Sequence, residues 1–250
     1  MLNQVAPMLL SSGQDVDVGI TGYVSYELFG QTLYLTTTHV GLVIILLAFV
    51  VFALVANRAL KKADPYKSPS GLVNVLEMLV EMLDNLTKEN MGAKHGWKFS
   101  NYIGTLFAFI LVCNISGLLG LRAPTADYGT TLGLALITFV LIHYNGFKYQ
   151  KMSHITDLFH PIVLSPINII GEIATPLSMS LRLFGNILSG TVMLGLIYGL
   201  LPKLLLLFMS PIMGVLHAYF DGFSGAIQTY VFCMLTMVFI SQNFDTDEEM

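Results

Sequence analysis

The apolar residues divide the chain into long hydrophobic blocks separated by short polar segments. Three blocks, at about 39–57, 99–121 and 129–147, have the length of a helix that crosses a hydrocarbon core of about 30 Å. Two more, 165–200 and 203–243, are longer than a perpendicular crossing requires, because 36 helical residues extend for about 54 Å. The pattern predicts an all-α integral membrane protein with about five membrane-crossing helices, the last two long and steeply tilted.

Prolines leave a second interpretation open for the two longest blocks. Pro176 and Pro211 lie inside them, and a proline within a helix kinks or breaks it. Each block is therefore either one tilted helix or two shorter ones. Splitting either block alone moves the C-terminal tail to the other side of the membrane.

Basic residues favour single crossings and fix an orientation. With five crossings, only Arg122 and Lys203 fall on one side of the membrane. The other side of the membrane then carries nine basic residues: Arg58, Lys61, Lys62, Lys67, Lys88, Lys94, Lys98, Lys148 and Lys151. Because cytoplasmic loops are enriched in Lys and Arg, we expect an extracytoplasmic N-terminus and a cytoplasmic C-terminus.

Two segments outside the crossings have patterns of their own. Residues 72–88 repeat apolar positions at helical spacing, with Glu77, Glu81 and Asp84 on other faces. This predicts one amphipathic helix on the membrane surface, or alternatively a soluble helix packed on a neighbouring loop. Residues 1–38 contain no Lys or Arg and predict a polar extracytoplasmic arm, which leaves 39–250 as a single membrane domain.

Composition excludes several classes of protein. The chain is 54% hydrophobic and 11% charged, too apolar for an ordinary soluble domain. Cys113 and Cys233 lie in apolar blocks, so we interpret both as packing residues. Without a phosphate loop, nucleophile motif or metal-ligand cluster, the sequence predicts no cofactor, no metal and no self-contained ATPase. The net charge of −4 and the acidic tail 245–249 argue against nucleic acid as a partner.

Arg182 is the residue that most needs an explanation, because it lies deep inside the fourth block. An arginine at the centre of a membrane helix costs roughly 2.5 to 3.5 kcal/mol on insertion scales, and its guanidinium stays charged. On a helix it shares a face with Gly185, Asn186 and Ser189, and small residues allow another helix to approach closely. The stripe predicts a surface for a partner helix. The alternative is an arginine that extends to the headgroups or pairs with one carboxylate.

A second polar group lies in the last block. Asp221, Ser224, Gly225 and Gln228 have the spacing of one helix face, and His217 precedes Asp221 by one turn. His217 and Asp221 are therefore placed to exchange protons, because imidazole ordinarily titrates near neutral pH. The alternative is that Asp221 only neutralises His217 or Arg182.

Two further polar side chains fall at membrane depth. Asn114 lies in the second crossing and His143 in the third. An unpaired donor or acceptor in lipid costs several kcal/mol. Each side chain therefore lines a wet path or makes a satisfied contact between helices.

The run Ser-Leu-Arg182-Leu-Phe-Gly-Asn186, with Gln228, resembles the signature of subunit a of F-type ATP synthases. The resemblance covers about residues 30–243. It implies that Arg182 faces the rotating c-ring, that Asn186 and Gln228 are its polar neighbours, and that two aqueous half-channels serve the ring carboxylates. The implied partners are the c-ring subunits, the peripheral-stalk b subunits and the rest of the complex. The Leu-Phe-Gly form resembles bacterial or plastid members, which implies a bacterial cell membrane.

Two positions depart from the pattern of that family. Nine residues after the arginine, where relatives often have Glu or His, this chain has Thr191, so Asp221 carries the access-channel role alone. Fourteen residues before the arginine, several relatives have a glutamate where this chain has Asn168. We therefore expect Glu172, ten residues before the arginine, at the exit channel.

The function implied is that of an ion-translocating stator subunit, which couples ion flow through the c-ring to ATP synthesis. The alternative is a secondary transporter that binds an anionic substrate at Arg182 and couples an ion at Asp221. Transporters usually contain internal repeats, and the two long blocks share no motif. Both H⁺ and Na⁺ stay open as the coupling ion, because the selective ligands would lie mostly on the ring.

Overall fold

The structure is a computed structural model of the chain. It describes residues 22–28, 31–63, 71–153, 156, 159, 165–200 and 203–244. Three features of the sequence lie outside the described residues: the first 21 residues of the predicted arm, Lys67 of the basic cluster, and the acidic tail 245–249.

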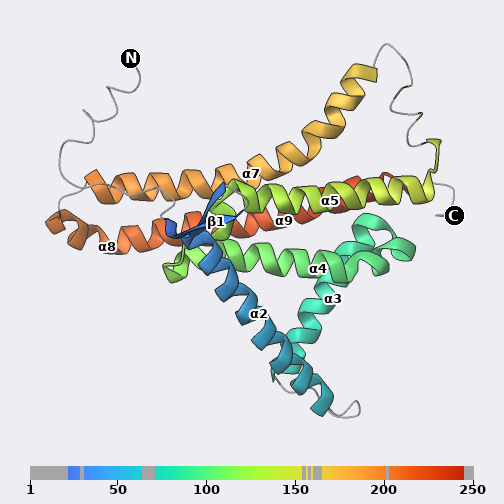
Figure 1. The fold of residues 1–250 in the computed structure, drawn as a ribbon. Helices are drawn as coiled ribbons and strands as arrows, with labels where there is room; N and C mark the ends of the chain where they lie inside the picture. Colours follow the sequence, from blue (N-terminus) through green and yellow to red (C-terminus); the bar gives the residue numbers. More distant parts are fainter. Residues whose placement is uncertain are drawn as a thin grey trace.

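Helices make up most of the described chain (Figure 1). They are α2 (Thr37–Lys62), α3 (Gly71–Met91), α4 (Ala93–Ile115), α5 (Tyr128–Tyr149), α7 (Ser165–Leu200), α8 (Lys203–His217) and α9 (Gly225–Ser241). The 3₁₀ turns η2 (Ser116–Leu119) and η3 (Pro124–Ala126) connect α4 to α5, and the π-helix η4 (Ala218–Ser224) joins α8 to α9. Five stretches are long and apolar enough to cross a membrane, which confirms the predicted number: Thr37–Lys62, Ala93–Leu119, Tyr128–Tyr149, Ser165–Gly199 and Ser210–Ser241.

Neither of the two longest blocks is split into separate crossings. α7 is one helix of 36 residues, and α8, η4 and α9 follow one another without a break. α7 changes direction partway along its length (Figure 1). Pro176 lies inside it, and a proline lacks the N–H that the helical hydrogen bond needs. The interpretation as two shorter helices is therefore wrong for both blocks.

The part of the N-terminal arm that the structure describes contains a β-hairpin, which the sequence analysis did not predict. β1 (Gly22–Leu28) pairs antiparallel with β2 (Gln31–Thr36). Aromatic and β-branched residues suit strands, and this short stretch has several of both. α2 begins directly after β2, where the Thr36 N–H donates to Nδ1 of His39 at 3.3 Å.

The predicted amphipathic helix is α3, and it packs along α4. A Cβ on Gly96 would lie 2.6 Å from the Thr87 carbonyl oxygen, so only glycine allows this approach. The apolar side chains of Val75, Met78 and Met82 stay exposed on α3. The helix therefore packs on another helix rather than on a loop, and its exposed apolar side chains leave the expected place on a membrane surface as a prediction.

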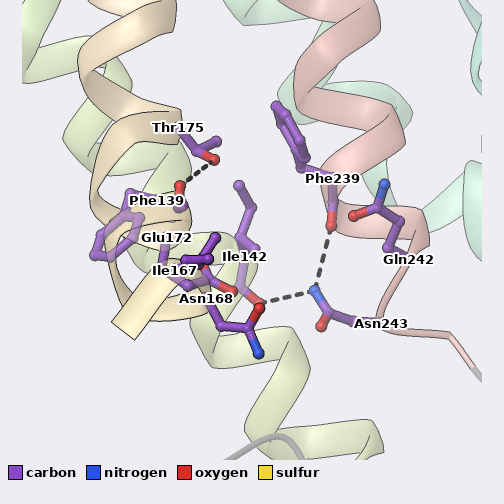
Figure 2. A pocket seen from close by; sticks show the side chains of 10 residues that line it. Phe139, Ile142, Ile167, Asn168, Glu172, Thr175, Phe239, Gln242 and Asn243 are labelled. Atoms are coloured by element: carbon purple, nitrogen blue, oxygen red, sulfur yellow. Dashed lines mark hydrogen bonds between the residues drawn. The ribbon is translucent and has the colours of Figure 1, made fainter. Parts of the chain in front are cut away.

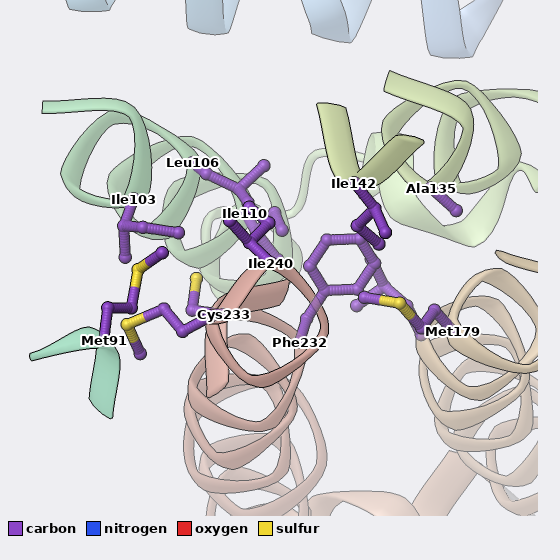
Figure 3. Close-up of a cluster of buried hydrophobic side chains, with 12 residues drawn as sticks. Met91, Ile103, Leu106, Ile110, Ala135, Ile142, Met179, Phe232, Cys233 and Ile240 are labelled. Carbon is purple, nitrogen blue, oxygen red and sulfur yellow. The ribbon is translucent and has the colours of Figure 1, made fainter. Parts of the chain in front are cut away.

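The largest buried cluster joins α4, α5, α7 and α9 (Figure 3). Leu183 of α7 and Phe232 of α9 are almost fully buried in it, together with Ile103 and Ile110 of α4. Cys113 and Cys233 are buried and free, as expected for packing residues. Met179, Leu183 and Ile187 mark the inner face of α7 at four-residue spacing. This burial fixes which face of α7 is left to point outward.

Candidate functional site

Arg182 lies on the outer face of α7 and is exposed. Its sequence neighbour Leu183 is 0% exposed, so the packing of Leu183 sets the direction in which the arginine points. Among the residues that the structure describes, the guanidinium has no hydrogen bond or ion pair. Neither Asp221 nor another described carboxylate neutralises it. A charged group in an apolar helix without an internal partner needs one from outside the chain.

The polar stripe predicted beside Arg182 divides into two parts. Ser189 is exposed, and a Cβ added to Gly185 would meet no atom within 4 Å, so Arg182, Gly185 and Ser189 form an open surface. Asn186 faces the last helical segment instead. Ser224 Oγ donates to Asn186 Oδ1 at 3.0 Å, and Asn186 Nδ2 lies 3.5 Å from the Ser224 carbonyl oxygen. The outer part can meet a partner while the inner part fixes the hairpin of the two long helices.

Gln228 follows Ser224 by one turn on α9. Its side chain is 8% exposed, and its Nε2 has no hydrogen-bond acceptor within the described part of the chain. A buried amide donor without a partner costs about 1–3 kcal/mol. The Gln228 amide can therefore donate a hydrogen bond to a partner beyond the described residues, such as water or another subunit.

Asp221 lies in the π-helix η4, and π-helical turns frequently occur at functional sites. His217 Nδ1 is 2.8 Å from Asp221 Oδ2, as the one-turn spacing predicted. A Cβ on Gly117 would lie 3.0 Å from the Asp221 carboxyl carbon, so this glycine makes room for the carboxylate. Tyr198 of α7 places its hydroxyl 3.0 Å from His217 Nε2. The sequence analysis missed Gly117 and Tyr198, because nothing in the spacing relates them to Asp221.

Asn114 is buried at the centre of a polar cluster. Its Nδ2 lies 2.9 Å from the Gly225 carbonyl oxygen and 3.1 Å from Thr229 Oγ1, and its Oδ1 accepts from Thr125 at 2.7 Å. The side chain therefore ties α4 to α9 and to η3. This geometry is that of the satisfied interhelix contact, which was the alternative to a place along a wet path.

One cavity, which we name the Asp221 cavity, has a volume of about 370 Å³. It lies between the C-terminal half of α7, the segment from η2 to η3, and the region of His217 and Asp221. Thr191 and Tyr198 of α7 and Arg122 also line it. The structure thus brings Thr191, one of the two positions that depart from the family pattern, into the same space as Asp221.

A second cavity, which we name the Glu172 cavity, has a volume of about 590 Å³ (Figure 2). Its wall combines the N-terminal half of α7, including Asn168 and Glu172, with parts of α5 and the end of α9. His143 Nε2 lies 3.8 Å from Glu172 Oε2. Asn243 Nδ2 donates to the Ile142 and Phe239 carbonyl oxygens at 3.2 and 3.3 Å, which joins α5 to α9 at this cavity.

The two cavities lie on opposite halves of the long helices, and neither reaches Arg182. On α7, the Glu172 cavity extends as far as Thr175 and the Asp221 cavity begins at Ile187. Twelve helical residues between these positions correspond to about 18 Å. On the last segment, Asp221 lines one cavity and Phe239 the other. Arg182 and Gln228 lie between the helix stretches that line the two cavities and are part of neither lining.

These features define a multi-pass membrane protein with two separate cavities along its long helices and an outward-facing arginine between them. The family model described as ATP synthase A chain matches residues 38–241. The chain belongs to this family, and its function is ion translocation in the stator of an F-type ATP synthase. The resemblance inferred from the Arg182 motif is thereby confirmed, and the secondary-transporter alternative is not supported.

Curated relatives agree with the family model. The chain is 34% identical over 246 residues to the chloroplastic ATP synthase subunit a of Stigeoclonium helveticum, which covers 92% of each chain. It is 36% identical to ATP synthase subunit a of Priestia megaterium, over 87% of this chain and 96% of that one. It is 40% identical to the sodium ion specific subunit a of Propionigenium modestum, over 66% and 60% of the two chains.

Proposed function

We propose that the Asp221 cavity and the Glu172 cavity are two half-channels, and that Arg182 separates them at the surface of a c-ring. The observation that carries the proposal is the position of Arg182. It points outward, without a partner in the described chain, from the part of α7 between the two cavities. An ion that enters one cavity must then leave the protein, travel on a ring subunit and return through the other.

The charge of Arg182 determines where a ring carboxylate releases its proton. A ring carboxylate that faces lipid must be neutral, because an ionised group there is very costly. Beside Arg182 the ionised form is favoured by the nearby positive charge, so the carboxylate releases its proton there. Arginine keeps its own proton, which blocks direct passage between the half-channels. Each charge that crosses 100 mV releases about 2.3 kcal/mol, and rotation delivers this energy to ATP synthesis.

Asp221 is the acid that accepts the ion on the access side. It lines the cavity together with His217 and Thr191, and it is the only carboxylate among the described residues of this lining. Asn186 and Gln228 act near Arg182, where Asn186 holds α7 against η4 through Ser224 and Gln228 supplies a buried amide on α9. Asn114 contributes by fixing α9 rather than by contact with the ion.

Glu172 serves the exit side together with His143. The 3.8 Å separation of His143 Nε2 and Glu172 Oε2 is too long for a hydrogen bond, so the two exchange a proton through water or after a small movement of either side chain. Asn168 lines the same cavity and supplies a neutral hydrogen-bonding group where several relatives have a glutamate.

The Glu172 cavity opens to the cytoplasm in this proposal. Gln150 Nε2 donates to the Gln242 carbonyl oxygen, so the ends of α5 and α9 meet near this cavity. Lys148 and Lys151 lie at this end of α5, and Lys and Arg are enriched on the cytoplasmic side. The N-terminus is then extracytoplasmic and the C-terminus cytoplasmic, in a bacterial plasma membrane. In this proposal the chain also contacts lipid and the peripheral-stalk b subunits.

Protons are the ions that this path suits best. His143 lies near Glu172, where its imidazole nitrogen can carry a proton, and the Nδ1 of His217 is 2.8 Å from Asp221, the carboxylate that takes up the ion. Hard cations such as Na⁺ prefer oxygen ligands and gain little from imidazole. ATP-driven acidification of liposomes should therefore proceed in sodium-free buffer.

Labelling from each side of the membrane tests the proposal. Thr191→Cys and Thr175→Cys place a thiol in each cavity, in a chain whose buried Cys113 and Cys233 have been replaced by alanine. A membrane-impermeant thiol reagent should label Thr191→Cys from the extracytoplasmic side only and Thr175→Cys from the cytoplasmic side only. Leu183→Cys, at a fully buried position, is the control and should react from neither side. Labelling of both cavity positions from the same side would contradict the division into half-channels.

A further inference from the structure

Tyr198 contacts His217 across the hairpin of the two long helices. The tyrosine oxygen is 3.0 Å from His217 Nε2, and the ring centroids are 5.9 Å apart. The two residues are 19 positions apart in the sequence, on α7 and at the end of α8. Both line the Asp221 cavity, so the contact belongs to the path rather than to the core.

The hydrogen bonds determine which nitrogen of His217 carries a proton. Nδ1 is 2.8 Å from Asp221 Oδ2, and an ionised carboxylate only accepts. Nδ1 must therefore be protonated when Asp221 is ionised. In the neutral imidazole Nε2 then accepts, and the Tyr198 hydroxyl is the donor that matches it. Tyr198, His217 and Asp221 form a hydrogen-bonded chain in which each group fixes the next.

The carboxylate is oriented by this chain. Oδ2 of Asp221 accepts from His217, while Oδ1 has no donor among the described residues and remains for the incoming ion. Charged and titratable groups face this site from each side of the cavity. They are Arg122 from the segment before η3, Tyr198 from α7, and His217 and Asp221 from the last helical segment.

We propose that Tyr198 is a positioning residue for ion uptake, a proposal that rests on the function proposed above. Tyr198 holds His217 in the tautomer that donates to Asp221, and so keeps the carboxylate turned toward the cavity. A hydronium ion in the cavity transfers its proton to Oδ1, which leaves water and a neutral Asp221. Asp221 then passes this proton toward the ring and returns to the carboxylate form. His217 keeps its own proton throughout.

Four complexes reconstituted in liposomes test this role: wild type, Tyr198→Phe, His217→Gln and the double variant. Tyr198→Phe removes one oxygen and keeps the ring, so the complex should assemble. The measurement is the proton translocation rate per assembled complex, across pH on the access side. A hydrogen bond contributes about 0.5–1.5 kcal/mol, so we expect a loss of about 2- to 10-fold in the rate. Tyr144→Phe, an exposed tyrosine of α5 outside both cavities, is the matched control and should leave the rate unchanged.

The double variant separates a positioning role from a structural one. If Tyr198 acts through His217, adding Tyr198→Phe to His217→Gln causes no further loss, and both single variants change the pH profile in the same way. An unchanged rate in Tyr198→Phe, or losses that multiply in the double variant, would overturn the inference. Asp221→Asn separates this failure from a failure of the proposed function. If Asp221→Asn stops translocation while Tyr198→Phe does not slow it, the proposed role of Tyr198 is wrong and the proposed function of the cavity stands.

Discussion

Asn186 and Ser224 join α7 to η4 through their side chains, with Ser224 Oγ donating to Asn186 Oδ1 at 3.0 Å. Asn186 lies one helical turn after Arg182, and Ser224 lies one turn before Gln228. The contact therefore fixes the distance between the two helices at the level of the arginine. It also keeps the Asn186 amide away from the outer surface, which leaves Arg182, Gly185 and Ser189 to face a partner.

Replacement of Arg182 should abolish coupled ion transport without preventing assembly. The side chain is exposed and makes no hydrogen bond or ion pair in the described chain, so Arg182→Ala removes little folding energy. We expect no ATP-driven proton pumping above background in reconstituted liposomes. Arg182→Lys should fail as well, because a compact ammonium lacks the planar fork and loses its proton more readily in an apolar site. Coupled pumping by Arg182→Ala at the wild-type rate would contradict the proposed role.

Apolar replacements at Asn186 and Gln228 should impair coupling only partly. Asn186→Leu loses the hydrogen bonds to Ser224, and Gln228→Leu loses a buried amide that has no acceptor in the described chain. The lost hydrogen bond of Asn186 is worth about 0.5–1.5 kcal/mol, so we expect a rate about 2- to 10-fold below wild type per assembled complex for Asn186→Leu, and a partial loss for Gln228→Leu because its buried polar group is removed. The rate of Ser224→Ala per assembled complex should be close to that of the less impaired of these two variants. If Gln228→Leu is as damaging as Arg182→Ala, the order of the two roles is wrong.

Asp221→Asn should slow ion uptake severely. The amide keeps the size and hydrogen bonding of the carboxyl group but cannot take up a proton. The translocation rate, normalised to assembled complex and measured across pH, distinguishes this role from that of a counter-ion, which would lower the yield of complex instead.

A second substitution tests whether position 191 can replace Asp221. Thr191 lines the same cavity, so Thr191→Glu in the Asp221→Asn background should restore part of the lost rate. Thr175→Glu, in the Glu172 cavity, is the matched control and should restore nothing. An unchanged rate per complex in Asp221→Asn alone would remove the carboxylate from the access path.

Gly96→Ala should weaken the α3–α4 pair and lower the yield of assembled protein. The added Cβ would lie 2.6 Å from the Thr87 carbonyl oxygen and 2.9 Å from the Lys88 Cα, and backbone atoms cannot move aside cheaply. Overpacking of this kind typically costs about 1–3 kcal/mol. Gly133→Ala in α5 is the control, since its Cβ would meet no atom within 4 Å, and it should leave the melting temperature unchanged. Equal melting temperatures for the two variants would show that the helices separate easily.

The local sequence pattern was enough to predict the helices. A bilayer offers no hydrogen bonds to the backbone, so a long apolar block must form a helix. For this reason the hydropathy of the chain predicted the five crossings and α3, and the family motif around Arg182 predicted the function. The hairpin of β1 and β2 was missed, since the predicted arm was judged on its lack of charge and not on its short runs of aromatic and β-branched residues.

The sequence by itself thus determined which segments cross the membrane and that Arg182 needs a partner, because these follow from the cost of placing each residue in lipid. Only the tertiary structure decided which polar residues share a space. Tyr198 meets His217 because α7 and α8 form a hairpin, and Gly117 makes room for Asp221 because η2 lies against η4. The tertiary structure also places Asn114 in a contact between helices and Thr191 in the lining of the Asp221 cavity. Such contacts depend on how side chains far apart in the sequence pack together, and helical spacing describes only neighbours on one helix.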